Sequence, residues 1–279
     1  MQDKIKKTWF ITGASKGLGL AIVKQLLAAV QNVAATSRNI ASLTTAVGTT
    51  HKNFLPIQAN LADDTSVKQA IAETNTTFGS IDVLINNAGY GIGGSLEELT
   101  DAEVRTAFDV NVFGTINTIR HVLPYMRQQQ SGHIINIASI AGFTAGTGWA
   151  PYAATKFAIV GLTEVLADDV RAFGIKATVV APGAFRTNFL NDDSLAIPQN
   201  PIADYADVRA SHQHYLTMNG NQAGDPEKAA AVMIEAGFNP NPPVHLFLGT
   251  DAYTRALAKI ESLTNEIELL KDITTSTDY

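Results

Sequence analysis

The sequence predicts a doubly wound α/β fold, because short and almost continuously apolar runs alternate along the chain with helical patterns. Strands that are covered on both faces of a parallel sheet have this composition, and helices between them make right-handed crossovers. The expected strands are Thr8–Thr12, Val33–Ser37, Phe54–Ala59, Val83–Asn86, Ile134–Ala138, Ala177–Ala181 and Val244–Leu248. We therefore expect one domain over residues 1–279, with about seven parallel strands and helices on both faces.

The helices expected between these strands follow in the same order. They are Gly17–Val30, Asp64–Thr77, Asp101–Gln129, Pro151–Phe173 and Pro226–Phe238. Asp225 followed by Pro226 is typical of an N-cap with proline at the first helical position.

Two segments depart from this alternation. Residues 188–224 are rich in Asn, Asp, Pro and Gln, and we expect a lid there, because long insertions in compact domains are usually functional or disordered. Residues 250–279 are expected to form a helical extension. Its apolar residues Ala256, Ile260, Leu263, Ile267 and Leu270 recur with a four-three spacing and so share one helix face. That face can pack on the same chain or on a second subunit, and the spacing does not choose.

Composition excludes several classes of function. The formal net charge is −6, whereas nucleic-acid binding needs a clustered basic excess. The chain has no cysteine, so disulfides and thiolate metal sites are excluded. The six histidines show no metal-ligand spacing, and His212 and His214 in the lid segment are interpreted as solvated. No signal peptide or bilayer-spanning apolar run is present, so we expect a cytoplasmic protein that neither enters a membrane nor binds nucleic acid.

A glycine-rich turn connects the first strand to the first helix. Its residues Gly13, Ser15, Lys16, Gly17, Leu18 and Gly19 are candidates for binding a dinucleotide. Glycines let the backbone turn sharply and approach a pyrophosphate, and the helix N-terminus adds free N–H groups. On this segment alone, a tight turn without a ligand remains an alternative.

The residues at the end of the second strand indicate whether the dinucleotide is NAD or NADP. NAD-binding proteins usually carry an acidic residue there, which binds the ribose 2′-hydroxyl. This chain has Ser37 and Arg38 instead, with Lys16 in the glycine turn. Two cations and no carboxylate suit a 2′-phosphate, so the sequence favours NADP(H).

Tyr152 and Lys156 are spaced to lie on one face of the fourth expected helix. A lysine at this distance favours the phenolate, so the tyrosine can serve as an acid and a base. Ser139 follows an apolar strand, at the sheet edge where open α/β sheets bind ligands, and can hold a substrate oxygen. The Tyr-x-x-x-Lys spacing alone is common by chance; its combination with Ser139 and the glycine turn indicates a reductase centre.

The chain resembles the short-chain dehydrogenase/reductase family, a group with the Rossmann fold, up to about Leu248. The resemblance lies in Thr12-Gly-x-x-x-Gly-x-Gly19, Asn86-Asn87-Ala88-Gly89, Asn111, Ser139, Tyr152-x-x-x-Lys156, and Pro182-Gly183 followed by Thr187. It implies that Tyr152 donates and accepts the proton, that Ser139 orients the carbonyl, and that Lys156 binds the nicotinamide ribose and lowers the tyrosine pKa. Asn111 would hold a water in a proton relay.

The resemblance also implies further cofactor contacts. Asn87, Ala88 and Gly89 would flank the adenosine ribose, and Pro182, Gly183 and Thr187 would contact the nicotinamide. Relatives commonly have aspartate against the adenine, where this chain has Asn60 followed by Leu61. Many relatives end the first helix with glycine, where this chain has Val30, so we expect Gln31 and Asn32 to make that turn.

These features predict NADPH-dependent reduction of a ketone or aldehyde. Phe143, Trp149, Phe185, Phe189, Leu190 and Tyr205 are candidates for an apolar pocket, so we expect a bulky, partly apolar ketone. Rival interpretations are an NAD-dependent epimerase or dehydratase, and a catalytically silent nucleotide sensor or scaffold. Relatives often form homodimers or homotetramers through the helices that correspond to Asp101–Gln129 and Pro151–Phe173.

Overall fold

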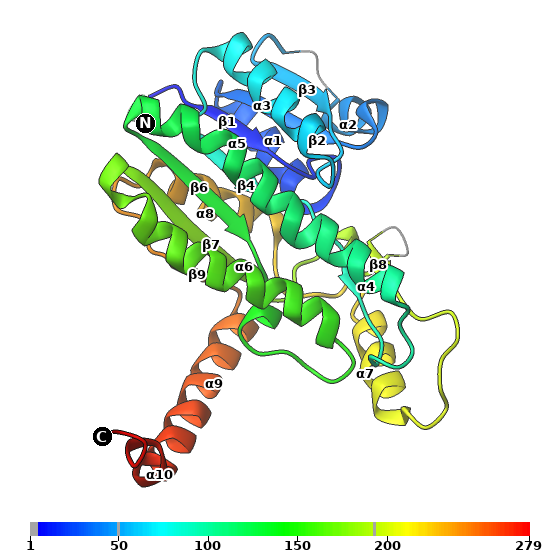
Figure 1. The fold of residues 1–279 in the computed structure, drawn as a ribbon. Helices are drawn as coiled ribbons and strands as arrows, with labels where there is room; N and C mark the ends of the chain where they lie inside the picture. The colour runs from blue at the N-terminus through cyan, green and yellow to red at the C-terminus, as the bar shows by residue number, and fades with distance from the viewer. Residues whose placement is uncertain (1–4, 49–50, 192–193) are drawn as a thin grey trace.

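The computed structural model describes residues 5–48, 51–191 and 194–279, and its core is a seven-stranded parallel sheet (Figure 1). The strand order is β3-β2-β1-β4-β6-β7-β9. The strands are β1 Thr8–Ile11, β2 Asn32–Ser37, β3 Phe54–Gln58, β4 Val83–Asn86, β6 Gly132–Ile137, β7 Ile175–Pro182 and β9 His245–Leu248. This confirms the doubly wound class and all seven expected strands.

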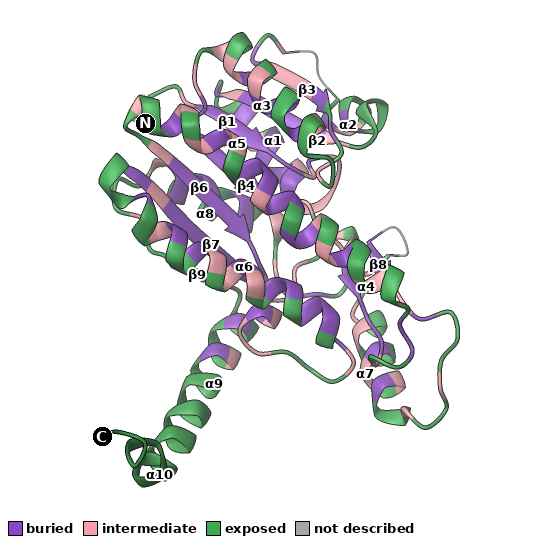
Figure 2. Cartoon of the chain, viewed as in Figure 1, coloured by how far each residue is buried: buried purple, intermediate pink, exposed green. Residues whose placement is uncertain are grey.

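Helices cover both faces of the sheet, and alternate strand residues contact opposite layers. On one face, Trp9 and Ile11 pack with α1 (Gly17–Ala28), α2 (Ile40–Val47) and α8 (Pro226–Phe238). On the other, Phe10 packs with α3 (Asp64–Phe78), α5 (Gly114–Gln129) and α6 (Ala150–Asp169). Strand residues on both sides are buried (Figure 2), which explains why the strands are apolar runs without a polar alternation.

The helices differ from expectation in two places. Helix α2 was not expected from the sequence; its N-cap Asn39 accepts a hydrogen bond from the Ser42 N–H. The expected helix Asp101–Gln129 is divided into α4 (Asp101–Phe108), a π-helical segment (Asp109–Phe113) and α5. Such π segments widen the helix by one residue and are frequent at functional sites.

The turn after α1 corrects a prediction. Val30 itself takes the left-handed conformation, with φ +59°, so the turn is not made by Gln31 and Asn32. The N–H of Gln31 bonds the carbonyl of Leu26, which closes the helix end around Val30. Valine is tolerated there at a cost in backbone energy, because these bonds and the following strand fix the geometry.

A buried polar network crosses the centre of the sheet. The Asn86 side-chain amide donates to Asn136 Oδ1 at 2.8 Å, and Asn86 Oδ1 accepts from Thr118 Oγ1 at 2.6 Å. Asn136 in turn donates to Thr163 Oγ1 at 2.9 Å. The network therefore ties α5 and α6 together through β4 and β6.

The insertion and the C-terminal extension leave the sheet in different ways. The described part of the insertion 188–224, which excludes residues 192–193, contains β8 (Leu195–Ala196) and α7 (Ala206–Thr217). Strand β8 pairs in parallel with β5 (Gly91–Ile92), and Phe185 bridges to Gly224 at the base of the insertion. Helices α9 (Thr250–Leu269) and α10 (Lys271–Thr275) project away from the body (Figure 1).

Candidate functional site: a nucleotide turn beside a buried tyrosine

The glycine turn is sharp, and two of its glycines lie against the end of β4. Gly13 and Gly17 have φ values of +65° and +58°. A Cβ on Gly13 would lie 2.7 Å from the Ala88 Cα, and one on Gly19 would lie 2.5 Å from the Asn87 side-chain nitrogen. The N-cap of α1, Lys16, makes no side-chain cap bond, so no side chain at that position competes with an anion for the N–H groups of the first turn. Ser15 and Leu18 complete the turn, and Leu18 packs against the core.

Thr12 and Asn87 join this turn to the end of β4. Thr12 Oγ1 accepts from the backbone N–H groups of Asn87 and Ala88, both at 3.0 Å. The Asn87 side chain donates to the carbonyls of Thr12 and Gly13 at 3.0 and 2.9 Å. These four hydrogen bonds hold the glycine turn and Asn87, both candidates for cofactor binding, together at the ends of the neighbouring strands β1 and β4. A parallel sheet predicts that such strand ends lie side by side.

The residues expected to select the cofactor lie at the same edge of the sheet. Ser37 ends β2, and Arg38 follows it on the surface. Arg38 is close enough to influence Tyr90, whose pKa is raised mainly by burial while the Arg38 charge opposes the rise. The structure therefore leaves Arg38 exposed directly after β2.

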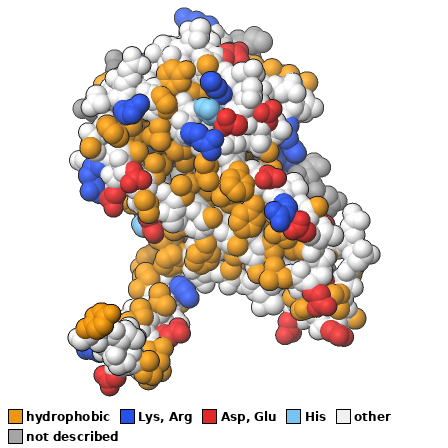
Figure 3. Space-filling model, viewed as in Figure 1, with side chains coloured by type: hydrophobic (Ala, Val, Ile, Leu, Met, Phe, Trp, Pro, Cys, Tyr) orange, Lys and Arg blue, Asp and Glu red, His pale blue; other side chains and the backbone are white. Residues whose placement is uncertain are grey.

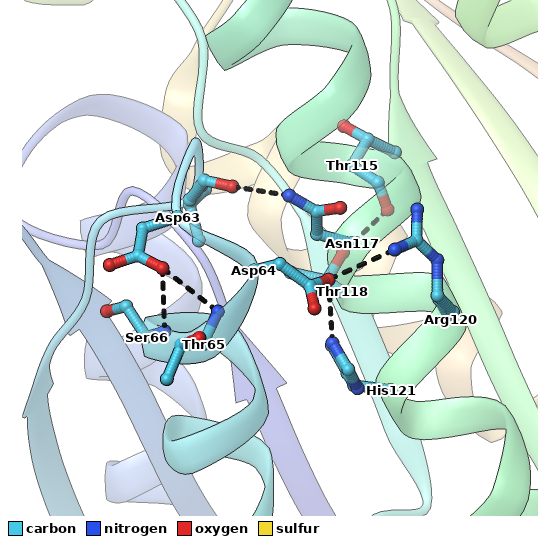
Figure 4. Close-up of polar contacts among 10 residues, drawn as sticks. Asp63, Asp64, Thr65, Ser66, Thr115, Asn117, Thr118, Arg120 and His121 are labelled. Atoms are coloured by element: carbon cyan, nitrogen blue, oxygen red, sulfur yellow. Dashed lines mark hydrogen bonds and ion pairs between the residues drawn. The ribbon is translucent and has the colours of Figure 1, made fainter.

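Asn60 and Leu61 occupy the loop between β3 and α3. The Asn60 side-chain oxygen accepts from the Ala62 N–H at 3.2 Å, so in this state it braces its own loop. The Leu61 carbonyl accepts from Asn117 of α5 at 3.0 Å. Figure 4 shows how the following turn is fixed: Asp63 caps α3, and Asp64 contacts Arg120 and His121 on α5.

Asn111 lies in the π-helical segment and connects the nucleotide side to helix α6. Its amide oxygen accepts from the Tyr90 N–H, and its amide nitrogen donates to the Tyr90 carbonyl, both at 3.0 Å. It also donates to Thr155 Oγ1 on α6 at 3.2 Å. A Cβ on Gly89 would lie 3.0 Å from Asn111 Oδ1 and 3.5 Å from Lys156 Nζ, so these three residues converge.

Ser139, Tyr152 and Lys156 meet at the carboxyl end of β6. Ser139 is the N-cap of a short 3-10 turn (Ile140–Gly142), and its hydroxyl lies close enough to the Tyr152 phenol to lower the phenol pKa. Lys156 Nζ donates to the Ile137 carbonyl at 3.1 Å and lies 5.7 Å from the centre of the Tyr152 ring. Both Tyr152 and Lys156 are buried. The four residues that the family resemblance assigns to catalysis are thus brought together.

Burial is the main cause of the shifted pKa values of Tyr152 and Lys156. It raises the pKa of Tyr152 to about 12, and the hydrogen bond from Ser139 only partly opposes it. This direction is the opposite of the lowering expected from Lys156. Burial also lowers the pKa of Lys156 to about 8, because the ammonium is desolvated. At neutral pH the phenol is therefore a protonated donor beside a cationic lysine.

An apolar cluster surrounds the Tyr152 ring. Trp149 and Phe189 have ring centres 6.3 and 5.8 Å from it, and Leu190 packs in the same cluster. Tyr215 of α7 joins them 5.0 Å from Trp149. These aromatic and aliphatic groups form an apolar wall beside Tyr152.

Other pocket candidates lie elsewhere. Phe143 packs 5.4 Å from Phe247 beside the start of α9, and Phe185 packs against the core between the sheet and α8. Tyr205 donates from the start of α7 to Glu97 on the surface. The sequence could not separate these residues from Phe189, since all follow strand ends or lie in loops.

The insertion is fastened over this cluster by residues that the sequence analysis missed. Arg209 of α7 reaches Glu98, whose carboxylate is fully buried, with its Nη2 atom 2.6 Å from each oxygen. His212 is also buried rather than solvated, which corrects the interpretation given to it. Its ring bonds the Gly148 carbonyl at 2.9 Å and packs 5.1 Å from Trp149.

The segment after β7 is held from an unexpected direction. The Asp251 carboxylate, at the start of α9, accepts from the Ala184 N–H at 2.8 Å and fills the space beside Gly183. Thr187 lies opposite Gly17, where a Cβ on the glycine would be 3.6 Å from the Thr187 Cβ. The segment that starts at Pro182 and Gly183 thus reaches the glycine turn through Thr187.

Two negative findings concern the described residues only. No helix in ranges 5–48, 51–191 and 194–279 is long and apolar enough to cross a membrane. Over the same part of the chain, His, Asp and Glu side chains form no group of three or more that could hold a metal ion.

Comparison with known proteins agrees with this geometry. Residues 7–196 match the family model described as short chain dehydrogenase. The chain is 35% identical over 242 residues to a 3-ketodihydrosphingosine reductase of Bacteroides thetaiotaomicron, covering 86% of this chain and 86% of that protein.

Solved structures give the same result. The crystal structure of a short-chain dehydrogenase from Streptomyces avermitilis superposes with a TM-score of 0.91 at 35% identity, covering 98% of this chain and 100% of that one. The structure of ElxO with NADP bound has a TM-score of 0.75 at 26% identity, covering 90% and 100%. The chain is therefore an oxidoreductase that belongs to the short-chain dehydrogenase family.

Proposed function

We propose that this protein reduces a ketone or aldehyde with NADPH, and that Tyr152 donates the proton to the carbonyl oxygen. The observation that carries the proposal is the meeting of Ser139, Tyr152 and Lys156 at the strand ends where the glycine turn also opens. The bound cofactor supplies the hydride. The chain supplies position, electrostatics and the proton.

Each side chain has a distinct task in this proposal. Ser139 and Tyr152 both bind the carbonyl oxygen, and Tyr152 transfers its proton as negative charge develops there. The ammonium of Lys156 stabilises the tyrosinate that remains, because the two groups are close and buried. Asn111 fixes Tyr90 and Thr155 and forms the route through which a water would reprotonate the pair.

Selection of NADPH is assigned to Lys16 and Arg38. The two cations flank the edge of the glycine turn, and Arg38 is exposed at the end of β2. ElxO, a structural relative, binds NADP. Gly13 and Gly19 let the turn lie against Ala88 and Asn87, and Asn87 to Gly89 together with Pro182 to Thr187 would contact the cofactor.

A bulky, partly apolar ketone fits the site best. Trp149, Phe189 and Leu190 lie beside the proton donor, and α7 closes over them through Arg209 and His212. A relative from Bacteroides thetaiotaomicron is named for the reduction of a 3-keto compound. Small polar hydroxy acids or sugars would leave this apolar wall without contacts.

The test follows consumption of NADPH and NADH with a panel of aryl and alkyl ketones, hydroxy acids and sugars. Tyr152→Phe keeps the ring contacts with Trp149 and Phe189 and removes only the hydroxyl, so we expect folding to persist and turnover to fall at least about 100-fold. Tyr125→Phe on α5 is the matched control and should retain full activity.

Three results would contradict parts of the proposal. Activity that survives Tyr152→Phe would remove the proton-donor role. A preference for NADH, or Lys16→Ala and Arg38→Ala variants that lose less than about threefold in kcat/KM with NADPH, would remove the cofactor assignment. Binding of NADPH without turnover across the whole panel would favour a nucleotide sensor.

A further inference from the structure

The C-terminal helix α9 leaves the body with almost no support from its own chain. Ala252 and Ala256 in its first turns are buried, beside Ile140 and Phe247. Arg255 donates to the Thr144 carbonyl at the same junction. Every residue from 257 to 279 is exposed (Figure 2), so the helix projects into solvent as a single rod.

The projecting part carries an apolar stripe that soluble proteins rarely leave uncovered. Ile260, Leu263, Ile267 and Leu270 are 50, 44, 57 and 42% exposed. They follow the four-three spacing of one helix face and continue the line of Ala256 away from the body. Figure 3 shows apolar side chains along this helix, separated by charged ones.

The pattern indicates another helix of the same kind as the partner. In heptad terms, isoleucine lies at the a positions (Ile260 and Ile267) and leucine at the d positions (Leu263 and Leu270), which is the apolar seam of a coiled coil. A membrane surface is disfavoured, because residues 251–279 contain three basic and six acidic residues, and the cytoplasmic leaflet is negatively charged.

We propose that α9 pairs with α9 of a second copy of this chain, with the two helices antiparallel about a two-fold axis. In the pair of residues nearest to the two-fold axis, Ile260 of one copy packs against Leu263 of the partner subunit. In that register the flanking g positions put Lys259 opposite Glu266 of the partner subunit, and the symmetry repeats this pair. This arrangement covers Ile260 and Leu263 and pairs both charges.

The first test measures the mass of the full-length protein by sedimentation and light scattering. Ile260→Glu puts a charge into the central layer and should halve the mass of the assembly at a fixed concentration. Asn265→Glu adds the same charge on the outer face of the helix and should leave the mass unchanged. An unchanged mass for Ile260→Glu, with helix content retained by circular dichroism, would overturn the proposal.

A charge-swap series tests the pairing even where Ile260→Glu unfolds the helix. Lys259→Glu and Glu266→Lys should each weaken association about fivefold, because each creates two like-charge contacts. The double variant should recover to within about twofold of wild type. A double variant as weak as the singles would refute the antiparallel register.

The absence of cysteine from the chain allows a direct test of orientation. Thr264→Cys lies near the two-fold axis and should cross-link to its own copy with a short bismaleimide. Leu269→Cys should not, since antiparallel pairing separates the two copies of residue 269 by roughly 20 Å along the helices. Efficient cross-linking at residue 269 and none at residue 264 would contradict the proposal. None of these readouts depends on catalysis.

Discussion

Replacing Arg209 with methionine removes the guanidinium that neutralises the buried Glu98 carboxylate. The Glu98 side chain is 0% exposed, and one Arg209 nitrogen lies 2.6 Å from both of its oxygens. Two backbone N–H groups, those of Ser95 and Ile202, bond the same carboxylate at 2.9 and 2.8 Å. Methionine retains length and apolar contact, so the loss reports the charge.

The expected cost of this change is about 3 kcal/mol. Breaking a buried ion pair by removing one partner costs about 3–5 kcal/mol, since the other charge stays buried. The lower end applies here, because the backbone N–H groups remain on Glu98 and the Arg209 side chain is 31% exposed. The loss should concentrate in α7 and β8, which Arg209 fastens over the Tyr152 cluster.

The assay combines urea unfolding with hydrogen exchange of residues 195–217. Glu98→Gln in the Arg209→Met background removes the orphaned charge and should recover at least about 1 kcal/mol. Arg105→Met is the control, because its pair with Asp101 is 75 and 78% exposed and should cost less than about 0.5 kcal/mol. The reasoning fails if Arg209→Met costs no more than this control, or if the double variant is no more stable than Arg209→Met.

The contribution of the Glu98–Arg209 pair to stability should depend on pH. Burial raises the pKa of Glu98, but hydrogen bonds from Ser95, Ile202 and Arg209 outweigh it and hold the pKa at about 2. The folded pKa lies below the ordinary 4.5, so this stabilisation is present at neutral pH and is lost as the pH falls from about 4.5 toward about 2. In Arg209→Met one of these bonds is absent and the pKa rises, so the variant should differ least from wild type in acid.

Four further outcomes are expected. Val30→Gly should be about 1 kcal/mol more stable than Val30→Ala in urea unfolding, because φ is +59° there; equal stabilities would contradict the strain argument. Gly19→Ala should weaken NADPH binding at least about tenfold in a fluorescence titration, because the new Cβ would lie 2.5 Å from the Asn87 side chain. Gly161→Ala is the control and should not change the affinity, because a Cβ there would have nothing within 4 Å. Asn136→Ala should lower the unfolding free energy by about 2–3 kcal/mol because it leaves the Asn86 amide unpaired, and a loss under about 1 kcal/mol would show that the network relaxes. For ketone reduction, kcat/KM should fall as the pH rises through about 8, because Lys156 loses its charge there. Tyr152 stays protonated over this range, because its pKa is raised to about 12. A flat profile to about pH 10 would argue against the role of Lys156.

The sequence determined the sheet, the family and which residues lie at the centre, since these depend on local patterns. Short apolar runs such as Val83–Asn86 are typical of strands in a parallel sheet that is covered on both faces, and parallel strands bring their carboxyl ends to one edge. Ser139 and the glycine turn therefore lie at the same edge of the sheet. Tyr152 and Lys156 followed from helical spacing alone.

The contacts that depend on which distant residues meet were decided only by the tertiary structure. Glu98 and Arg209 are 111 residues apart, and Asp251 reaches the N–H of Ala184 across 67 residues. No spacing rule links such pairs, so a buried carboxylate and a surface one look alike in the sequence. The same holds for His212, which is buried because Gly93 and Gly148 leave room for its ring. Burial also reversed the expected direction of the Tyr152 pKa, because desolvation depends on every neighbour of the ring and not on Lys156 alone.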